Sequence, residues 1–142
     1  MVAAYERSRD RGLAARQVRV LVDTHSLVWA LASPEALSSK ARRILADSEV
    51  IASVANLWEL LLKGPKKNAL LTDPLTWWER HVSGNAIPVL SIRVSHVIAL
   101  GRLPDIHRDP FDRILIAQAL VENLPVVSKD AQLGKYKARI LW

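Results

Sequence analysis

The stretch VRVLVDTHSLVWALA, residues 18–32, decides the class of fold. It opens with a run of apolar and β-branched residues that ends at Asp23, which is typical of a strand buried on both faces of a parallel sheet. The residues from Thr24 onward predict a helix that ends near Ser33-Pro34. A buried strand that leads directly into a helix is the first half of a βαβ unit.

The rest of the chain repeats this alternation. Further strands are predicted at 49–53, 87–91, 125–130 and 138–142, and helices at 37–47, 53–63, 74–82, 93–103 and 109–124. In the helix at 93–103, Val94, Val97, Ile98 and Leu103 mark one apolar face. The pattern predicts an α/β fold in which a central, mostly parallel sheet of four to five strands has helices on both faces.

Length and composition indicate one ordinary globular domain. The chain has 142 residues, of which 50% are hydrophobic and 24% charged. No apolar run is long enough to span a bilayer and no secretory signal begins the chain, so we expect a cytoplasmic protein without a membrane segment. The absence of cysteine excludes a disulfide framework, a zinc-thiolate site and a thiol nucleophile.

The chain is basic, and its first 17 residues differ from the rest. Residues 1–17 are polar and Arg-rich and predict a flexible extension, whereas the folded domain is expected at 18–142. The net charge is +6, which favours a polyanion such as nucleic acid because Lys and Arg gain by releasing counterions from phosphates. Solubility alone is the alternative explanation of this charge.

Four acidic residues stand where one predicted element gives way to another: Asp23, Glu59, Asp112 and Asp130. Asp23 and Asp130 each follow a strand, and the carboxyl ends of parallel strands face the crevice where open α/β sheets bind ligands. Each acid also has a structural explanation. Asp23 suits a helix cap and Glu59 a solvated helix face, while Asp109 and Asp112 suit the start of a helix.

The joint pattern favours a metal site over four unrelated structural roles. Several carboxylates in one crevice repel each other unless a cation compensates their charge, and oxygen ligands favour Mg²⁺ or Mn²⁺ over zinc. The four histidines show no ligand pair at helical spacing, and no glycine-rich phosphate loop or nucleophilic serine motif occurs. The pair Trp77-Trp78 is a candidate for partner contact.

Four segments together resemble a known family: VLVDTHSLVWAL (20–31), SVANLWELLLK (53–63), HRDPFDRILIAQALVENLPVVSKD (107–130) and ARILW (138–142). They are similar to the PIN-domain ribonucleases and, among these, to the VapC-type toxins of bacterial toxin–antitoxin pairs. The resemblance covers essentially residues 18–142. The Arg-rich extension has no counterpart in the family, and the loop GPKKNAL (64–70) is shorter and more basic than usual.

The resemblance implies a three-layer α/β sandwich and a metal-dependent endoribonuclease that acts as the toxin of such a pair. It assigns the catalytic, metal-binding acids to Asp23, Glu59, Asp112 and Asp130, of which Asp130 binds directly or through water. Thr24 matches the hydroxyl residue that orients the site. Asp109 matches less closely and has three alternatives: a residue behind the ligands, a helix cap or an alternative ligand.

The chemistry expected of this site is hydrolysis of RNA phosphodiesters. A Mg²⁺ or Mn²⁺ ion would lower the pKa of a bound water, and in-line attack would leave a 5′-phosphate and a 3′-hydroxyl. Arg108, Arg113 and Lys129 are candidates for phosphate contact, with a solvated rim as the alternative. The resemblance further implies a homodimer and a small antitoxin that places a basic side chain among the acids.

Two other functions fit parts of the sequence. A non-catalytic RNA-binding module on the same scaffold would not need all four acids. A phospho-acceptor signalling domain also gathers acids at strand ends, but it needs an acidic pair after the first strand and a lysine after the last. Val22-Asp23 and Lys129-Asp130 do not fit that pattern, and it leaves Glu59 without a role.

Overall fold

The computed structural model describes residues 18–64 and 70–142, and its centre is a five-stranded parallel sheet of order β3-β2-β1-β4-β5. The strands are β1 Arg19–Val22, β2 Glu49–Ser53, β3 Val89–Leu90, β4 Val126–Val127 and β5 Ile140–Leu141. Every neighbouring pair runs parallel, so the predicted sheet is confirmed. The predicted N-terminal extension, 1–17, and residues 65–69 of the basic loop lie outside the described residues.

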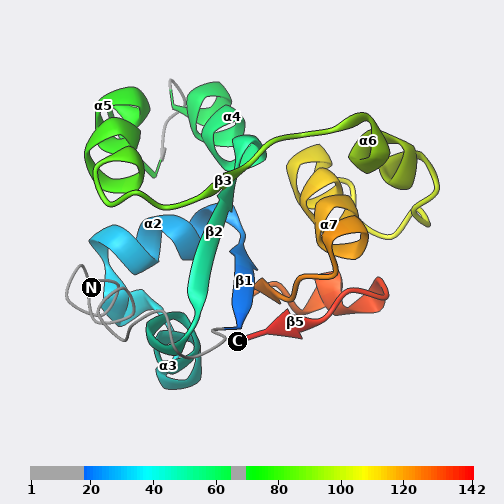
Figure 1. Ribbon diagram of the computed structural model, residues 1–142, viewed down its shortest axis with the longest axis horizontal. Helices are drawn as coiled ribbons and strands as arrows, with labels where there is room; N and C mark the ends of the chain where they lie inside the picture. Colours follow the sequence, from blue (N-terminus) through cyan, green and yellow to red (C-terminus); the bar gives the residue numbers. More distant parts are fainter. Residues whose placement is uncertain (1–17, 65–69) are drawn as a thin grey trace.

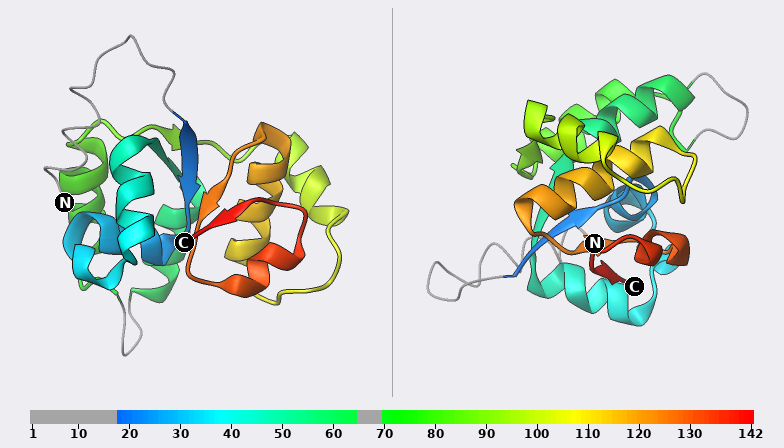
Figure 2. Two further views of the ribbon diagram at one scale, coloured as in Figure 1. Left: turned by 90° about the horizontal axis from the view of Figure 1, so that it is seen from below. Right: turned by 90° about the vertical axis from the view of Figure 1, so that its right-hand side faces the viewer.

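Helices cover both faces of the sheet (Figures 1 and 2). The α-helices are α2 Thr24–Ala32, α3 Ser39–Asp47, α4 Val54–Lys63, α5 Pro74–Trp78, α6 Val94–Gly101 and α7 Pro110–Glu122. Three short helical turns complete the described structure: η1 Pro34–Ala36, the π-helical η2 Glu79–Ser83, and η3 Ala131–Lys135. Helices α2, α3 and α5 lie on one side of the sheet and α6 and α7 on the other (Figure 1), which confirms the three-layer α/β sandwich.

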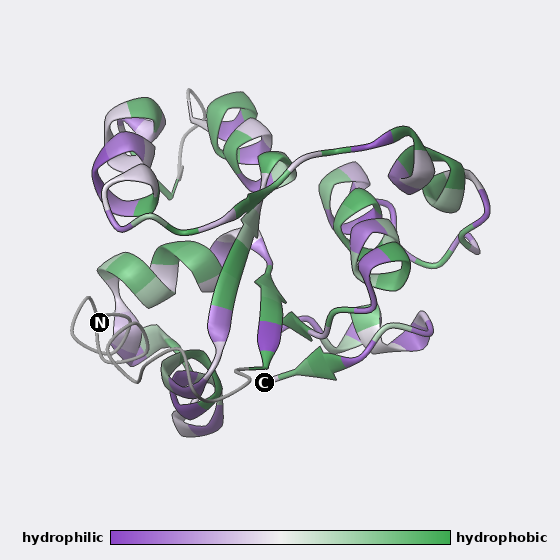
Figure 3. Ribbon diagram, in the orientation of Figure 1, coloured by the Kyte–Doolittle hydropathy of each residue, from purple (hydrophilic) through white to green (hydrophobic). Residues whose placement is uncertain are grey.

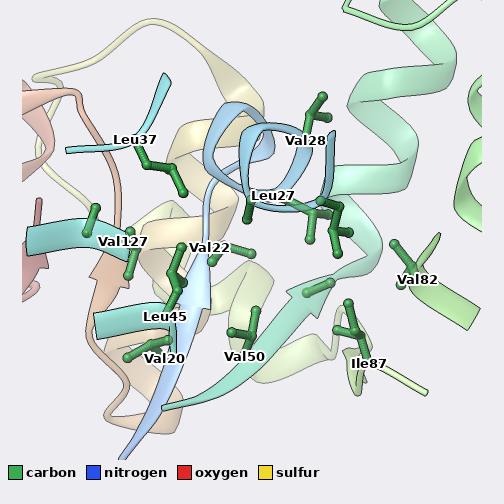
Figure 4. Close-up of a cluster of buried hydrophobic side chains, with 14 of the residues drawn as sticks. Val20, Val22, Leu27, Val28, Leu37, Leu45, Val50, Val82, Ile87 and Val127 are labelled. Atoms are coloured by element: carbon green, nitrogen blue, oxygen red, sulfur yellow. The ribbon is translucent and has the colours of Figure 1, made fainter. Parts of the chain in front are cut away.

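Strand β1 is buried on both faces, as its continuous apolar run predicts. Val20 and Val22 pack into a core with α2 and α3 (Figure 4). Leu21 faces a second core with α7. Apart from their charged first residues and the serine that ends β2, β1 and β2 are hydrophobic (Figure 3). The two cores clamp this strand and thereby fix the position of Asp23, the residue that follows it.

The apolar face predicted for the helix at 93–103 is wrong for three of its residues. Val94, Val97 and Ile98 are 76%, 52% and 51% exposed. The side of α6 that is turned inward instead carries His96, whose Nδ1 accepts a hydrogen bond from Arg93 N and whose Nε2 lies 2.9 Å from Glu122 Oε1. The hydrophobic pattern of a short, valine-rich helix therefore did not reveal which side is buried.

The tryptophan pair also differs from its prediction. Trp78 is buried in the core and Trp77 is half-buried against it, so this pair is mainly structural. The exposed tryptophan is Trp58 on α4, at 54%. Among the described residues, no helix is both long and apolar enough to span a membrane.

The sheet changes direction beside β1. The chain runs from β1 through β2 to β3 on one side and places β4 and β5 on the other. Ligands of open α/β sheets bind at such a switch point, outside the carboxyl ends of the strands. The residues that follow β1 and β4 therefore occupy the position where this fold offers a site.

A buried amide ties α4 to this edge of the sheet. Asn56 Oδ1 accepts from Ser53 N at 2.7 Å, which completes the cap of α4. Its Nδ2 donates to Val22 O at 3.3 Å and to Thr24 Oγ1 at 3.2 Å. One side chain thus connects the ends of β1 and β2 with the starts of α2 and α4.

We predict that Asn56→Ala lowers the free energy of unfolding by about 2–4 kcal/mol, because it leaves buried backbone groups without partners. Urea denaturation measures this change. The control is Arg43→Ala on the exposed side of α3, which should shift stability by no more than about 0.5 kcal/mol. Equal stability of Asn56→Ala and the wild type would contradict the assigned role.

Candidate metal centre at the carboxyl edge of the sheet

A cavity of about 320 Å³ lies at the switch point of the sheet. It is lined by residues from both sides of β1: Asp23, Thr24, His25, Trp29, Glu59, Lys63, Asp109, Asp112, Lys129 and Asp130. All four acids expected at the site from the sequence are in this set, and so are the two residues expected to support them. Side chains that lie up to 107 positions apart in the sequence therefore meet in one place.

Asp23 combines the two roles that its local sequence left open. Its Oδ1 accepts from Ser26 N at 2.9 Å and so caps α2, while its Oδ2 accepts from the Ser128 hydroxyl. The residue is only 8% exposed, because it stands between two adjacent parallel strands. The same side chain therefore caps α2 and lines the cavity.

Glu59 is buried, at 6% exposure, so the solvated face that its local sequence allowed is wrong. One turn of helix separates it from Lys63, whose ammonium group donates to Glu59 Oε2. Thr24 donates to Oε1 from the start of α2. Lys63 also reaches Asp109 Oδ2 at 3.4 Å, and together these partners raise the pKa of Lys63 although burial acts in the opposite direction.

Asp109 and Asp112 share the first turn of α7 but differ in environment. Asp109 Oδ1 accepts from Phe111 N at 2.8 Å and from Asp112 N at 3.2 Å, which makes it the helix cap. Burial, followed by the negative charges of Asp109, Glu59 and Asp23, raises the pKa of Asp112 to about 7. Asp112 is thus the carboxylate on which the repulsion within the cluster is concentrated.

Asp130 follows β4 and contacts a residue that the sequence analysis did not select. Its Oδ1 accepts from Gln132 N at 2.9 Å, and its Oδ2 lies 3.0 Å from His107 Nε2. The same imidazole nitrogen is 3.6 Å from Asp112 Oδ2. A search for paired histidines could not find His107, because its partners are carboxylates on other elements.

The three basic residues proposed for phosphate contact are placed differently. Lys129 lines the cavity and is exposed. Arg113 donates to Pro104 O at 2.9 Å and to the Tyr136 hydroxyl at 3.3 Å, and it is not among the lining residues. Arg108 is exposed and also outside the lining set.

The donor set fits a hard divalent cation. The residues that line the cavity include five carboxylates but only two lysines, Lys63 and Lys129. The raised pKa of Asp112 shifts this carboxyl group toward its neutral form. Hard cations with oxygen ligands relieve such repulsion. Among the described residues, His107, Asp112 and Asp130 also hold their ligand atoms within 4.8 Å of one another.

Comparison with known proteins identifies the family of this domain. The family model described as the PIN domain matches residues 20–138. The chain belongs to the PIN-domain family. The match extends from β1 almost to β5 and includes every residue of the acidic cavity.

Two named proteins resemble this PIN domain. Ribonuclease VapC22 of Mycobacterium tuberculosis is 27% identical over 120 residues, which are 83% of this chain and 92% of that protein. A crystal structure of VapBC2 from Rickettsia felis, bound to a DNA fragment from their promoter, matches with a TM-score of 0.62 at 12% identity. That match covers 87% of this chain and 97% of the other and shows a common fold.

We predict that Asp112→Asn stabilises the PIN domain at alkaline pH in the presence of a chelator. The pKa of Asp112 is raised in the folded state, so the folded protein holds this proton more tightly than the unfolded chain does. The resulting contribution to stability is complete below the ordinary pKa of an aspartate and is lost as the pH rises through about 7. Removing the charge should therefore increase the free energy of unfolding at pH 8.5 by about 1–2 kcal/mol, less than the full shift implies because the side chain keeps some solvent contact.

Urea denaturation at pH 5.5 and pH 8.5 tests this expectation. The matched control is Asp105→Asn on the exposed loop before α7, which should leave the difference between the two pH values as in the wild type. A variant at Asp112 that is less stable than the wild type at pH 8.5 would contradict the repulsion assigned to this site.

Proposed function

We propose that this PIN domain is a Mg²⁺- or Mn²⁺-dependent endoribonuclease and the toxin of a toxin–antitoxin pair. The observation that carries the proposal is the convergence of Asp23, Glu59, Asp112 and Asp130 in one cavity at the switch point of the sheet. The similarity to Ribonuclease VapC22 and to the VapBC2 complex supports the activity and the pairing.

The acids have distinct tasks in this proposal. Asp23, Glu59 and Asp112 would hold the ion directly, and Asp130 would do so directly or through water. When bound, the ion supplies a water of lowered pKa and neutralises charge on the phosphodiester. Thr24 keeps Glu59 oriented toward the cavity, and Asp109 holds the first turn of α7 so that Asp112 faces the other acids.

Electrostatics favour an RNA substrate. The chain has a net charge of +6, which attracts a polyanion, and Lys129 lines the cavity and is exposed, so it is placed for a phosphate contact. Arg108 remains a candidate on the exposed loop nearby, and Arg113 acts through Pro104 and Tyr136. An RNA substrate and an antitoxin would both be met in the cytoplasm.

A non-catalytic RNA-binding module is the alternative, but the cavity does not favour it. A module that only binds RNA gains nothing from buried carboxylates that repel its ligand and each other. Burial and the neighbouring carboxylates raise the pKa of Asp112 to about 7, and such perturbed groups gather at functional sites.

We predict that Asp23→Asn lowers kcat/KM for RNA cleavage by at least about 100-fold with the fold intact. The amide oxygen can still accept from Ser26 N, so the cap of α2 is retained. Cleavage of total RNA, with the ends mapped, measures the loss and should identify 5′-phosphate and 3′-hydroxyl products in the wild type.

Asp105→Asn serves as the matched control for this experiment and should cleave like the wild type. Chelation by EDTA should abolish cleavage, and Mg²⁺ or Mn²⁺ should restore it. Full activity of Asp23→Asn, or full activity in excess EDTA, would refute the proposed mechanism. Salt-sensitive RNA binding without cleavage would favour the alternative.

Two exposed apolar surfaces support the proposal that the protein binds an antitoxin and a second copy of itself. Trp58, Leu61 and Leu62 form an exposed strip on α4, which also carries Glu59, so we propose that the antitoxin packs on this strip. Val97 and Ile98 are exposed on α6, at the opposite side of α7, and we propose this face for the homodimer. Exposed apolar patches of this kind mark interaction sites.

We predict that the chain forms a dimer of twice its 15.9 kDa mass and that Val97→Glu makes it monomeric, because a charge would be buried without a partner. Light scattering after size-exclusion chromatography measures the mass. Leu62→Glu on α4 is the control and should remain dimeric. A monomeric wild type, or a dimer that Val97→Glu leaves intact, would contradict the proposed face.

A further inference from the structure

His107 lies between Asp109 and Asp130, and each of its ring nitrogens has a hydrogen-bond partner there. Its Nδ1 accepts a hydrogen bond from Asp109 N at 3.1 Å, and its Nε2 faces Asp130 Oδ2 at 3.0 Å. The side chain is 18% exposed. It contacts the acidic cluster from behind, since it is not among the residues that line the cavity.

The partner of Nδ1 fixes the position of the proton. A backbone amide can only donate, so Nδ1 must carry a lone pair, and the proton of the ring is on Nε2. The N–H of Nε2 then points at the carboxylate of Asp130. The ring is neutral in this state and acts as a hydrogen-bond donor.

The loop that carries His107 is anchored in this position. His107 N donates to the Tyr136 hydroxyl at 2.9 Å, and the same hydroxyl accepts from Arg113. Tyr136 is buried, and Arg113 additionally holds Pro104 O in the same loop. These contacts position the imidazole before any ligand arrives.

The same geometry excludes Nε2 as a ligand for the ion, although His107, Asp112 and Asp130 lie close enough for a three-residue site. Coordination through Nε2 requires its lone pair and would move the proton to Nδ1. Two donors, Nδ1–H and Asp109 N–H, would then face each other at 3.1 Å, and the loop would lose its hydrogen bond.

We propose that His107 is a positioning residue that donates to Asp130 through Nε2–H and does not itself bind the ion. Asp130 Oδ1 is held by Gln132 N, so the donation to Oδ2 leaves the carboxylate in a single orientation. Such hydrogen bonds behind a ligand set the geometry and strength of a metal site. The inference rests on the proposed function in one respect, which is that Asp130 helps to bind the metal ion.

The first test is the proton itself. Two-bond ¹H–¹⁵N correlation spectra of the histidine-labelled protein identify which ring nitrogen carries hydrogen. We expect the Nε2–H form without metal and the same form after Mg²⁺ is added. A proton on Nδ1, or loss of the Nε2 proton on addition of Mg²⁺, would make His107 a ligand and overturn the proposal.

The second test uses two substitutions to distinguish the role of Nδ1 from that of Nε2. In His107→Asn the side-chain oxygen replaces Nδ1 as the acceptor for Asp109 N, but nothing reaches Asp130. In His107→Gln the amide nitrogen can reach Asp130. We expect His107→Asn to weaken Mn²⁺ binding roughly 10-fold and His107→Gln to weaken it less. His81→Asn, on the π-helical turn η2, is the matched control and should bind Mn²⁺ like the wild type.

A double-mutant cycle with Asp130→Asn decides whether His107 acts through Asp130. If it does, His107→Asn should have almost no further effect on Mn²⁺ affinity in the Asp130→Asn background. An equal loss in both backgrounds overturns the proposal, and so does a wild type that does not bind Mn²⁺. RNA cleavage is not needed for either readout, so failure of the ribonuclease proposal alone would leave Mn²⁺ binding and the cycle unchanged.

Discussion

Repulsion among the carboxylates at the end of β1 is the constraint on which the rest of the structure depends. Asp23 is buried at the end of β1 and Glu59 on α4, and burial of Asp112, followed by the charges of Asp109, Glu59 and Asp23, raises the pKa of Asp112 to about 7. Hydrogen-bond donors around the cluster offset part of the repulsion. Thr24 and Lys63 donate to Glu59, and Ser128 donates to Asp23. A divalent cation in the cavity would relieve the repulsion that remains.

The sheet was predictable because its signal is local. The continuous apolar run before Asp23 requires burial on both faces, and the two cores on either side of β1 confirm this. The start of α7 was predictable from Asp109 and Asp112 for the same reason. The apolar face assigned to α6 was wrong because a helix of eight residues can turn either side inward, and the choice is made by His96 and Glu122 on different elements.

The site was only partly predictable. Asp23 and Asp130 could be selected from their places at strand ends alone, but Glu59 needed the resemblance, because burial of a helix residue depends on the elements that cover it. His107 escaped entirely: its role lies in contacts with Asp109 and Asp130, 2 and 23 positions away, rather than in any spacing of like residues. Arg113 shows the converse, since a basic residue beside the motif serves the loop of Pro104.

The same aspartates cap helices and line the cavity in this molecule. The local sequence could therefore not separate a capping role from a place at the cavity. Asp23, Asp109 and Asp130 each bind a backbone amide at a helix start through Oδ1 and contact another side chain through Oδ2. The amide fixes one oxygen and so orients the other, at Ser128, Lys63 and His107 respectively. An aspartate that only caps a surface helix would leave its second oxygen to solvent. Three caps whose second oxygens are held by other side chains therefore fix the orientation of three carboxylates that line one cavity.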